Sequence, residues 1–209
     1  MIFQNRSDAG KQLAQKLLSY KAKKNAIVLG LARGGVLVAY EIAKALVLPL
    51  NVLVPRKIGA PDNPELALGA VAEDGEVWRN ESVIQFLGVS DAAIREATNQ
   101  ARQAAKERLA QYRKIAPLGD LKGKTVLLVD DGIATGASML VAIQSLRKQG
   151  VKTIVAAAPV AAADAWAVIR AASDEAVALL ILESFRGISQ FYLDFSQVED
   201  ERVLRLLQG

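Results

Sequence analysis

The α/β character of this chain is read first from Thr125-Val126-Leu127-Leu128-Val129-Asp130-Asp131-Gly132-Ile133-Ala134-Thr135-Gly136-Ala137-Ser138. Val126 to Val129 is an uninterrupted apolar run, which is typical of a strand covered on both faces in a parallel sheet. Gly132 and Gly136 allow backbone conformations that a Cβ atom would prevent. The segment therefore predicts a buried strand, a loop that begins with two carboxylates, and a new helix.

The loop Thr135 to Ser138 offers small residues at a helix start, where the first amides lack internal partners and the helix dipole favours an anion. Asp130 and Asp131 lie just before it, so a ribose 5-phosphate could place its phosphate on the amides and its hydroxyls on the carboxylates. The alternative is an ordinary strand-loop-helix connection with solvated acids. A Walker A lysine and a Gly-x-Gly-x-x-Gly pattern are both missing, so other phosphate loops fit less well.

The segment Val129 to Ser138 resembles the 5-phosphoribosyl 1-pyrophosphate (PRPP) signature of the type I phosphoribosyltransferases. The resemblance implies that Asp130 and Asp131 bind the ribose hydroxyls and, directly or through water, a Mg²⁺ ion. It also implies that the loop binds the 5-phosphate through Gly132, Ile133, Ala134, Thr135, Gly136, Ala137 and Ser138.

An apolar run at Asn25 to Leu29 predicts the first core strand, and it ends in Gly30-Leu31-Ala32-Arg33-Gly34-Gly35 before a helix-like segment. Backbone amides with a guanidinium group would suit a pyrophosphate, although most such turns are only turns. The resemblance implies that this loop grips the pyrophosphate, often through an unusual peptide bond. The residues concerned are Ala32, Arg33, Gly34 and Gly35.

The next predicted strand, Asn51 to Val54, runs into Pro55-Arg56-Lys57. Two cations at the carboxyl end of a strand lie where open α/β sheets bind ligands, but a solvated basic pair is an equal alternative. The resemblance implies that Arg56 and Lys57 bind pyrophosphate, and that Lys57 is the catalytic cation that meets it as it leaves.

Residues 59 to 80 form a candidate lid. Gly59 to Glu65 is rich in turn-forming residues, and Leu66 to Ala72 with Val77 to Arg79 predicts a short antiparallel ribbon. Such a segment could close over the reacting sugar and expel water, or it could be an ordinary surface hairpin.

The remaining chain alternates strands and helices, including strands at Lys152 to Ala158 and Ala176 to Leu182 and a long amphipathic helix at Asp91 to Lys114. We expect Ser7 or Asp8 to cap the first helix. The predicted fold is α/β, a mostly parallel sheet of about five strands flanked by helices, type I phosphoribosyltransferase-like and Rossmann-like. Residues 1–209 are expected to form a single phosphoribosyltransferase-like domain, with a small hood at 183–209.

Aromatic residues gather near the end of the chain at Phe185, Phe191, Tyr192 and Phe195. They could fill a small satellite core, which is the simpler interpretation. They could also line a base pocket, because members of the family carry a variable hood over the nucleobase.

The composition narrows the chemistry. The chain has no cysteine and no histidine, which excludes disulfides, thiol catalysis, histidine acid-base chemistry and the usual zinc sites. A net charge of +4, with scattered basic residues, suits a polyanionic small molecule and gives little support for nucleic acid. No signal peptide or membrane-length apolar run is visible, so a cytoplasmic protein is expected, and the long helix leaves a homodimer open.

The sequence therefore predicts a phosphoribosyltransferase that moves ribose 5-phosphate from PRPP to a nitrogenous acceptor, such as a nucleobase, with Mg²⁺ as cofactor and pyrophosphate as product. Asp130, Asp131 and Lys57 are the candidate catalytic residues. The alternative is a regulator that binds PRPP or nucleotides without turnover. Members that use 6-oxopurines usually carry an aspartate just before the Thr-Gly of the signature, where this chain has Ala134. Hypoxanthine and guanine are therefore expected to be poor acceptors.

Overall fold

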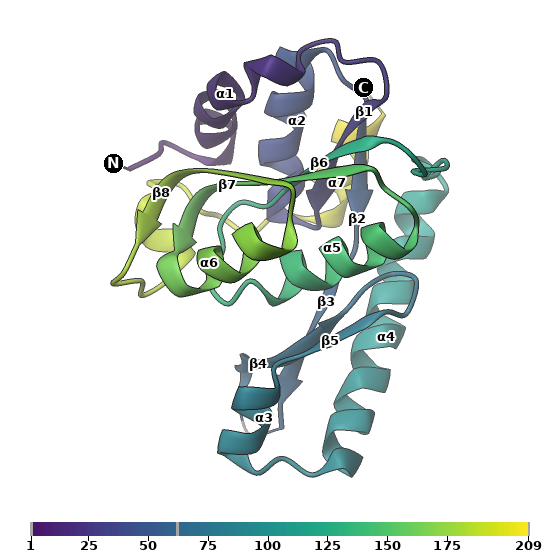
Figure 1. The fold of residues 1–209 in the computed structure, drawn as a ribbon, viewed down its shortest axis with the longest axis vertical. Helices are drawn as coiled ribbons and strands as arrows, with labels where there is room; N and C mark the ends of the chain where they lie inside the picture. Colours follow the sequence, from purple (N-terminus) through teal and green to yellow (C-terminus); the bar gives the residue numbers. More distant parts are fainter. Residues whose placement is uncertain (1, 62, 209) are drawn as a thin grey trace.

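The computed structural model describes residues 2–61 and 63–208, and its centre is a five-stranded sheet in the order β2-β1-β6-β7-β8. Every neighbouring pair of these strands is parallel, which confirms the predicted fold class (Figure 1). The strands are β1 (Ala26–Leu31), β2 (Leu50–Leu53), β6 (Thr125–Val129), β7 (Thr153–Ala162) and β8 (Glu175–Leu182).

Helices cover both faces of this sheet because alternate side chains of each strand point to opposite sides. Val28 of β1 packs with the core shared by α1 (Arg6–Lys16) and α2 (Gly34–Leu46). Leu29, the next residue, packs with the core of α5 (Ala137–Lys148) and α6 (Ala163–Ala172). The apolar runs of the sequence are thus covered by helices on both faces of the sheet, as a parallel sheet requires.

The strand order reverses direction at β1, since the chain moves from β1 outward to β2 and later returns to β6 on the other side. In open α/β sheets, ligands bind outside the carboxyl ends of the strands at such a switch point. The strands are aligned there, with Gly30 of β1 opposite Val129 of β6. The topology therefore brings the loop after Leu31 next to the loop after Val129.

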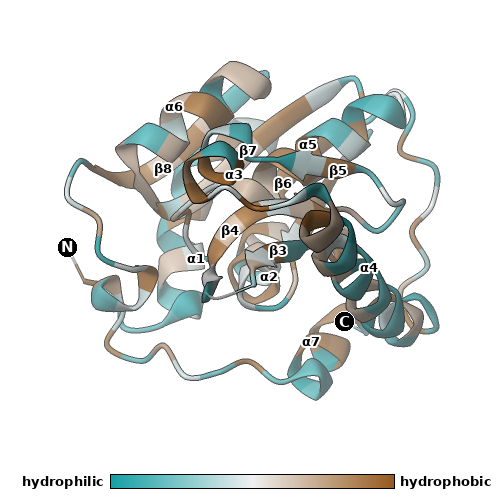
Figure 2. Cartoon of the chain, turned by 90° about the horizontal axis from the view of Figure 1, so that it is seen from below, coloured by the Kyte–Doolittle hydropathy of each residue, from teal (hydrophilic) through white to brown (hydrophobic). Residues whose placement is uncertain are grey.

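A second, antiparallel sheet extends from the main one together with the helices α3 (Glu81–Leu87) and α4 (Asp91–Arg113) (Figure 1). Its strands are β3 (Arg56–Ala60), β4 (Asn63–Val71) and β5 (Val77–Arg79). The predicted ribbon and long helix are confirmed, but the sequence analysis missed β3 and α3. The apolar face of β3 and β4 packs on α4, and Figure 2 shows that helix as largely hydrophilic with apolar residues interspersed.

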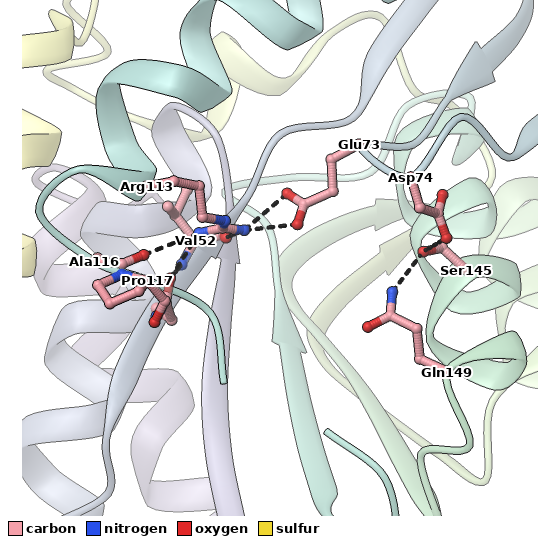
Figure 3. A network of polar contacts seen from close by, with 9 residues as sticks. Val52, Glu73, Asp74, Arg113, Ala116, Pro117, Ser145 and Gln149 are labelled. Carbon is pink, nitrogen blue, oxygen red and sulfur yellow. Dashed lines mark hydrogen bonds and ion pairs between the residues drawn. The ribbon is translucent and has the colours of Figure 1, made fainter. Parts of the chain in front are cut away.

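The turn between β4 and β5 is tied to the main body by polar side chains (Figure 3). Glu73 accepts two hydrogen bonds from Arg113 of α4, at 2.7 and 2.9 Å. Asp74 accepts a hydrogen bond from Ser145 of α5 at 2.7 Å, and Glu76 pairs with Lys148. This end of the ribbon is therefore fixed on two helices.

Hydrogen exchange can distinguish between the two interpretations of residues 59–80, a lid and a structural hairpin. Residues 59–76, apart from Asp62, which lies outside the described residues, contain both the tied turn and part of the strand β3. We expect the amides of Ala72, Gly75 and Glu76 to be protected with and without ligand, because they already donate hydrogen bonds within the turn. PRPP with Mg²⁺ is expected to slow exchange in β3, which carries Lys57. Slow exchange throughout 59–76 without ligand would make the whole segment a structural hairpin.

The first residues of the chain pack against the segment around Tyr192. Helix α1 begins at Arg6 and is capped by Asn5, whose side chain accepts from the Asp8 amide, so the expected caps at Ser7 or Asp8 were wrong. Phe3 pairs with Tyr192, next to a short 3₁₀ helix at Ile188–Phe191. A final helix, α7 (Asp200–Leu207), packs on α2 and β2. In the described parts of the chain, no helix has the length and apolar character needed to cross a membrane.

Candidate functional site

A cavity of about 260 Å³ lies at the switch point. It is bounded by the side chains of Lys57 from β3 and Asp130 from the end of β6, with Ile188 of the hood on one side. The rest of its lining is the loop and first turn after β6, namely Gly132, Ile133, Ala134, Thr135, Gly136, Ala137, Ser138 and Met139. The structure thus brings together the candidate phosphate loop, one of the two acids and the candidate catalytic lysine.

The loop presents backbone amides to this cavity. Gly136 is the N-cap of α5 with a φ of 74°, a left-handed conformation that glycine adopts without steric cost. Across the described residues, the amides of Ala134, Thr135 and Gly136 donate no backbone hydrogen bond. The Ile133 amide, by contrast, donates to the Val160 carbonyl at 2.9 Å and helps to fix the loop. The open amides make an anion site at the helix start.

Gly132 is required for a different reason. A Cβ atom at this position would lie 2.5 Å from Cγ2 of Ile188 in the hood. The missing side chain therefore lets the hood approach the phosphate loop closely.

The two acids of the signature have separate environments. Asp131 is buried, and its Oδ2 accepts a hydrogen bond from Nε of Arg6 at 2.6 Å. Asp130 is partly exposed to the cavity, and its Oδ1 accepts from the Asp131 amide at 2.8 Å. Asp131 was expected to bind ribose beside Asp130, but in this structure its carboxylate is engaged by an arginine from the start of the chain.

These environments also set the charges. Burial raises the pKa of the Asp130 carboxyl well above its ordinary value, and the neighbouring Asp131 raises it further. Burial raises the pKa of Asp131 as well, but the Arg6 guanidinium opposes that effect. A cation bound in the cavity would favour the ionised form of Asp130.

The loop after β1 packs directly on this acid pair, and its Ala32–Arg33 peptide bond is cis. A Cβ atom on Gly34 would lie 1.8 Å from Oδ2 of Asp131, and one on Gly35 would lie 2.7 Å from the Val129 carbonyl oxygen. Both glycines are thus needed for close contact between the two loops.

The candidate pyrophosphate cations are distributed over two places. Lys57 lines the phosphate-loop cavity and also a neighbouring cavity of about 550 Å³ between β3 and α4. Arg56 lines the second of these. The Arg33 guanidinium points to the start of α7, with Nη1 at 3.7 Å from Glu199 and 3.9 Å from Asp200.

The aromatic residues near the chain end mostly fill a satellite core. Tyr192 is buried against Phe3 and Phe195, and its hydroxyl donates to the Asp131 carbonyl at 2.6 Å. Phe191 packs on Phe185 with ring centroids 5.8 Å apart. Of the four base-pocket candidates, Phe185 lines a cavity of about 420 Å³, which it shares with Ala134, Thr135 and Asp164 among others.

The carboxylate of Asp130 fits a magnesium ion that is shared with the substrate. Among the described residues, no group of three or more acidic side chains converges. Asp130 offers a carboxylate to the cavity, and Mg²⁺ commonly uses one or two carboxylates with substrate phosphates and water. Asp130 together with oxygens of a bound substrate would hold the ion.

Three residues at or near the candidate site could not be identified from the sequence. Arg6 binds Asp131 across 125 positions of the chain, and nothing in its local sequence marks it. Ile188, the first residue of the 3₁₀ helix, lines the cavity, and its sequence neighbours did not indicate this. Arg108 of α4 binds Asp200, which lies 92 positions away in the chain.

Comparison with known proteins identifies the family of the chain. The family model described as "Phosphoribosyl transferase domain" matches residues 1–196. "Putative phosphoribosyl transferase Rv0571c" of Mycobacterium tuberculosis (strain H37Rv) is 39% identical over 206 residues, which cover 99% of this chain and 46% of the relative. The chain thus spans about half the length of the curated relatives it matches.

Solved structures give the same picture. TT1426 from Thermus thermophilus has a TM-score of 0.82 and 39% identity, covering 100% of this chain and 98% of that one. A purine phosphoribosyltransferase from Pyrococcus horikoshii has a TM-score of 0.51 and 21% identity, covering 93% and 92%, and this likeness concerns the fold alone.

Proposed function

The chain belongs to the phosphoribosyl transferase domain family, and on that premise we propose that it transfers ribose 5-phosphate from PRPP to a nitrogenous acceptor. The bond between C1 of the ribose and the pyrophosphate oxygen breaks, a bond from C1 to the acceptor nitrogen forms, and pyrophosphate and a proton are released. The observation that carries the proposal is the cavity in which open loop amides, the Asp130 carboxyl and Lys57 meet.

Each part of the cavity suits one part of PRPP. The amides of Ala134 to Ser138 would bind the 5-phosphate, since they have few partners and stand at a helix start. Asp130 would accept hydrogen bonds from the ribose hydroxyls. Lys57 would bind the pyrophosphate and stabilise the negative charge that it gains as it leaves.

Asp131 contributes indirectly in this proposal. Its ion pair with Arg6 and the contact of its carboxylate with Gly34 hold the two loops against each other. The position of the Asp130 carboxyl, which accepts from the Asp131 amide, depends on that arrangement. Mg²⁺, held as described above, would supply neutralising charge for the pyrophosphate when bound.

The direct test is consumption of PRPP by the purified chain with Mg²⁺, measured across purine, pyrimidine and other amine acceptors. Formation of pyrophosphate together with a new nucleotide for one acceptor class is the expected result. Calorimetric binding of PRPP without turnover for any acceptor would support a sensor instead. Absence of PRPP binding would remove the proposal.

One residue of the loop, Ala134, narrows the range of possible acceptor bases. Ala134 stands just before the Thr-Gly of the loop and lines both the phosphate cavity and the neighbouring one with Phe185. A methyl side chain can neither take nor give the ring proton of a 6-oxopurine. We therefore expect hypoxanthine and guanine to react slowly compared with acceptors that lack this requirement. The products are measured by chromatography. Efficient nucleotide formation from either base would contradict this expectation.

A further inference from the structure

Three arginines gather around one carboxylate at the edge of the site. Nε of Arg108 on α4 donates to Oδ1 of Asp200 at 3.1 Å, and Nη1 of Arg33 lies 3.9 Å from Oδ2 of the same side chain. Arg56 begins β3, which packs on α4, and its pKa is lowered by burial and further by the charges of Arg108 and Arg33. Tyr112, a buried residue of α4, also donates its hydroxyl to Asp200.

Among the residues that the structure describes, the charges in this cluster do not balance. Glu199, at 3.7 Å from Arg33, is the second carboxylate, so the cluster holds three guanidinium groups and two acids. The Arg33 contacts are long, and the Glu199 side chain is 63% exposed. Surface pairs of this kind contribute little stability and exchange easily. A more highly charged anion would therefore compete well with these acids for Arg33.

The strand order places this cluster beside the phosphate loop. Arg33 follows the carboxyl end of β1 and Arg56 follows that of β2, while the phosphate loop follows β6. These strands are neighbours in the order β2-β1-β6, so a ligand held by its 5-phosphate at β6 would extend its other end toward the arginines. Lys57 lines both the phosphate-loop cavity and the cavity between β3 and α4.

We propose that Arg108 joins Arg33 and Arg56 in binding the pyrophosphate group of PRPP, and that Asp200 occupies this position until the pyrophosphate displaces it. This inference rests on the proposed function. Guanidinium groups suit the task because their donors form a fork that matches phosphate oxygens. The helix that supplies Asp200 lies beyond residues 1–196, the part that the family model matches.

The test compares ligands with and without pyrophosphate, using the full chain and calorimetry. Arg108→Gln is expected to weaken binding of PRPP and of inorganic pyrophosphate about tenfold, the loss of a charge-assisted hydrogen bond. Ribose 5-phosphate, which lacks the pyrophosphate, should bind as it does to the wild type. Lys106→Gln is the matched control, since it removes the same charge from an exposed position on the same helix. Arg108→Lys should recover part of the loss.

Asp200→Asn tests the competition with the opposite sign. The amide keeps a hydrogen-bond acceptor for Tyr112 but loses the charge, so pyrophosphate and PRPP should bind about threefold to tenfold more tightly. Thermal melting of each variant checks that α7 remains folded.

Failure of this inference is distinct from failure of the proposed function. If the wild type binds PRPP and Arg108→Gln binds it equally well, Arg108 is not part of the site. Equal weakening of PRPP and ribose 5-phosphate would assign Arg108 a structural role and overturn the inference. Weaker PRPP binding in Asp200→Asn would overturn the competition. If the wild type binds no PRPP, the proposed function itself fails.

Discussion

Replacing Asp130 with asparagine is expected to weaken PRPP binding at least about tenfold, because a hydrogen bond to a charged group contributes about 1.5–3 kcal/mol. The fold should be retained. An asparagine Oδ1 can still accept from the Asp131 amide, as the Asp130 Oδ1 does at 2.8 Å. The substitution also removes a negative charge beside Asp131, so the midpoint of thermal unfolding should stay the same or rise.

Calorimetry with PRPP and Mg²⁺ measures this effect. Asp120→Asn is a suitable control, since Asp120 is an exposed carboxylate in the loop before β6 and the change of chemistry is the same. Unchanged PRPP affinity in Asp130→Asn would place the ribose site outside this cavity. A loss of affinity with an equal loss of folded protein would leave Asp130 as a structural residue and contradict the expectation.

The sequence predicted the main sheet well because its strands are apolar on both faces. Val126 to Val129 is buried on both faces of the sheet. A short apolar run that ends in a polar loop is typical of a strand inside a parallel sheet. β3 was missed because Arg56-Lys57-Ile58-Gly59-Ala60 carries two cations and a glycine, and its strand state depends on pairing with β4. Local propensity is weak evidence when tertiary pairing decides.

The site shows the same division between local and distant causes. The phosphate loop could be read from Gly136 and the small residues after it, since backbone geometry at a helix start is local. The different environments of Asp130 and Asp131 could not be read in this way. The two residues are chemically identical, and the partner Arg6, which is distant in sequence, distinguishes them.

The glycines give a similar lesson. Gly136 is needed for its positive φ, as the sequence suggested. Gly132 and Gly34 are needed because Ile188 and Asp131 approach them, and those contacts arise only in the folded chain. A glycine in a motif thus identifies a constraint without revealing its cause.

The Arg6–Asp131 pair supports the largest expected change in stability. Both side chains are nearly buried, with exposed fractions of 9% and 12%, and their N–O distance is 2.6 Å. Nη1 of Arg6 donates to the Ser196 carbonyl at 2.9 Å, and its guanidinium lies 3.8 Å from the centroid of the Phe195 ring. One side chain therefore connects the start of the chain, the acid pair and the hood.

Arg6→Met is expected to lower the free energy of unfolding by about 3–5 kcal/mol, because removing one partner leaves a buried carboxylate without its counter-charge. Arg6→Lys should recover only part of this loss, since an ammonium group cannot bind Asp131 and Ser196 while it stacks on Phe195. Denaturant unfolding measures both variants. The double variant Arg6→Met with Asp131→Asn should be more stable than Arg6→Met alone, because the unpaired charge is gone. If the effects of the two substitutions are simply additive, the stability does not come from the ion pair, and Arg6 acts only through its packing on the hood.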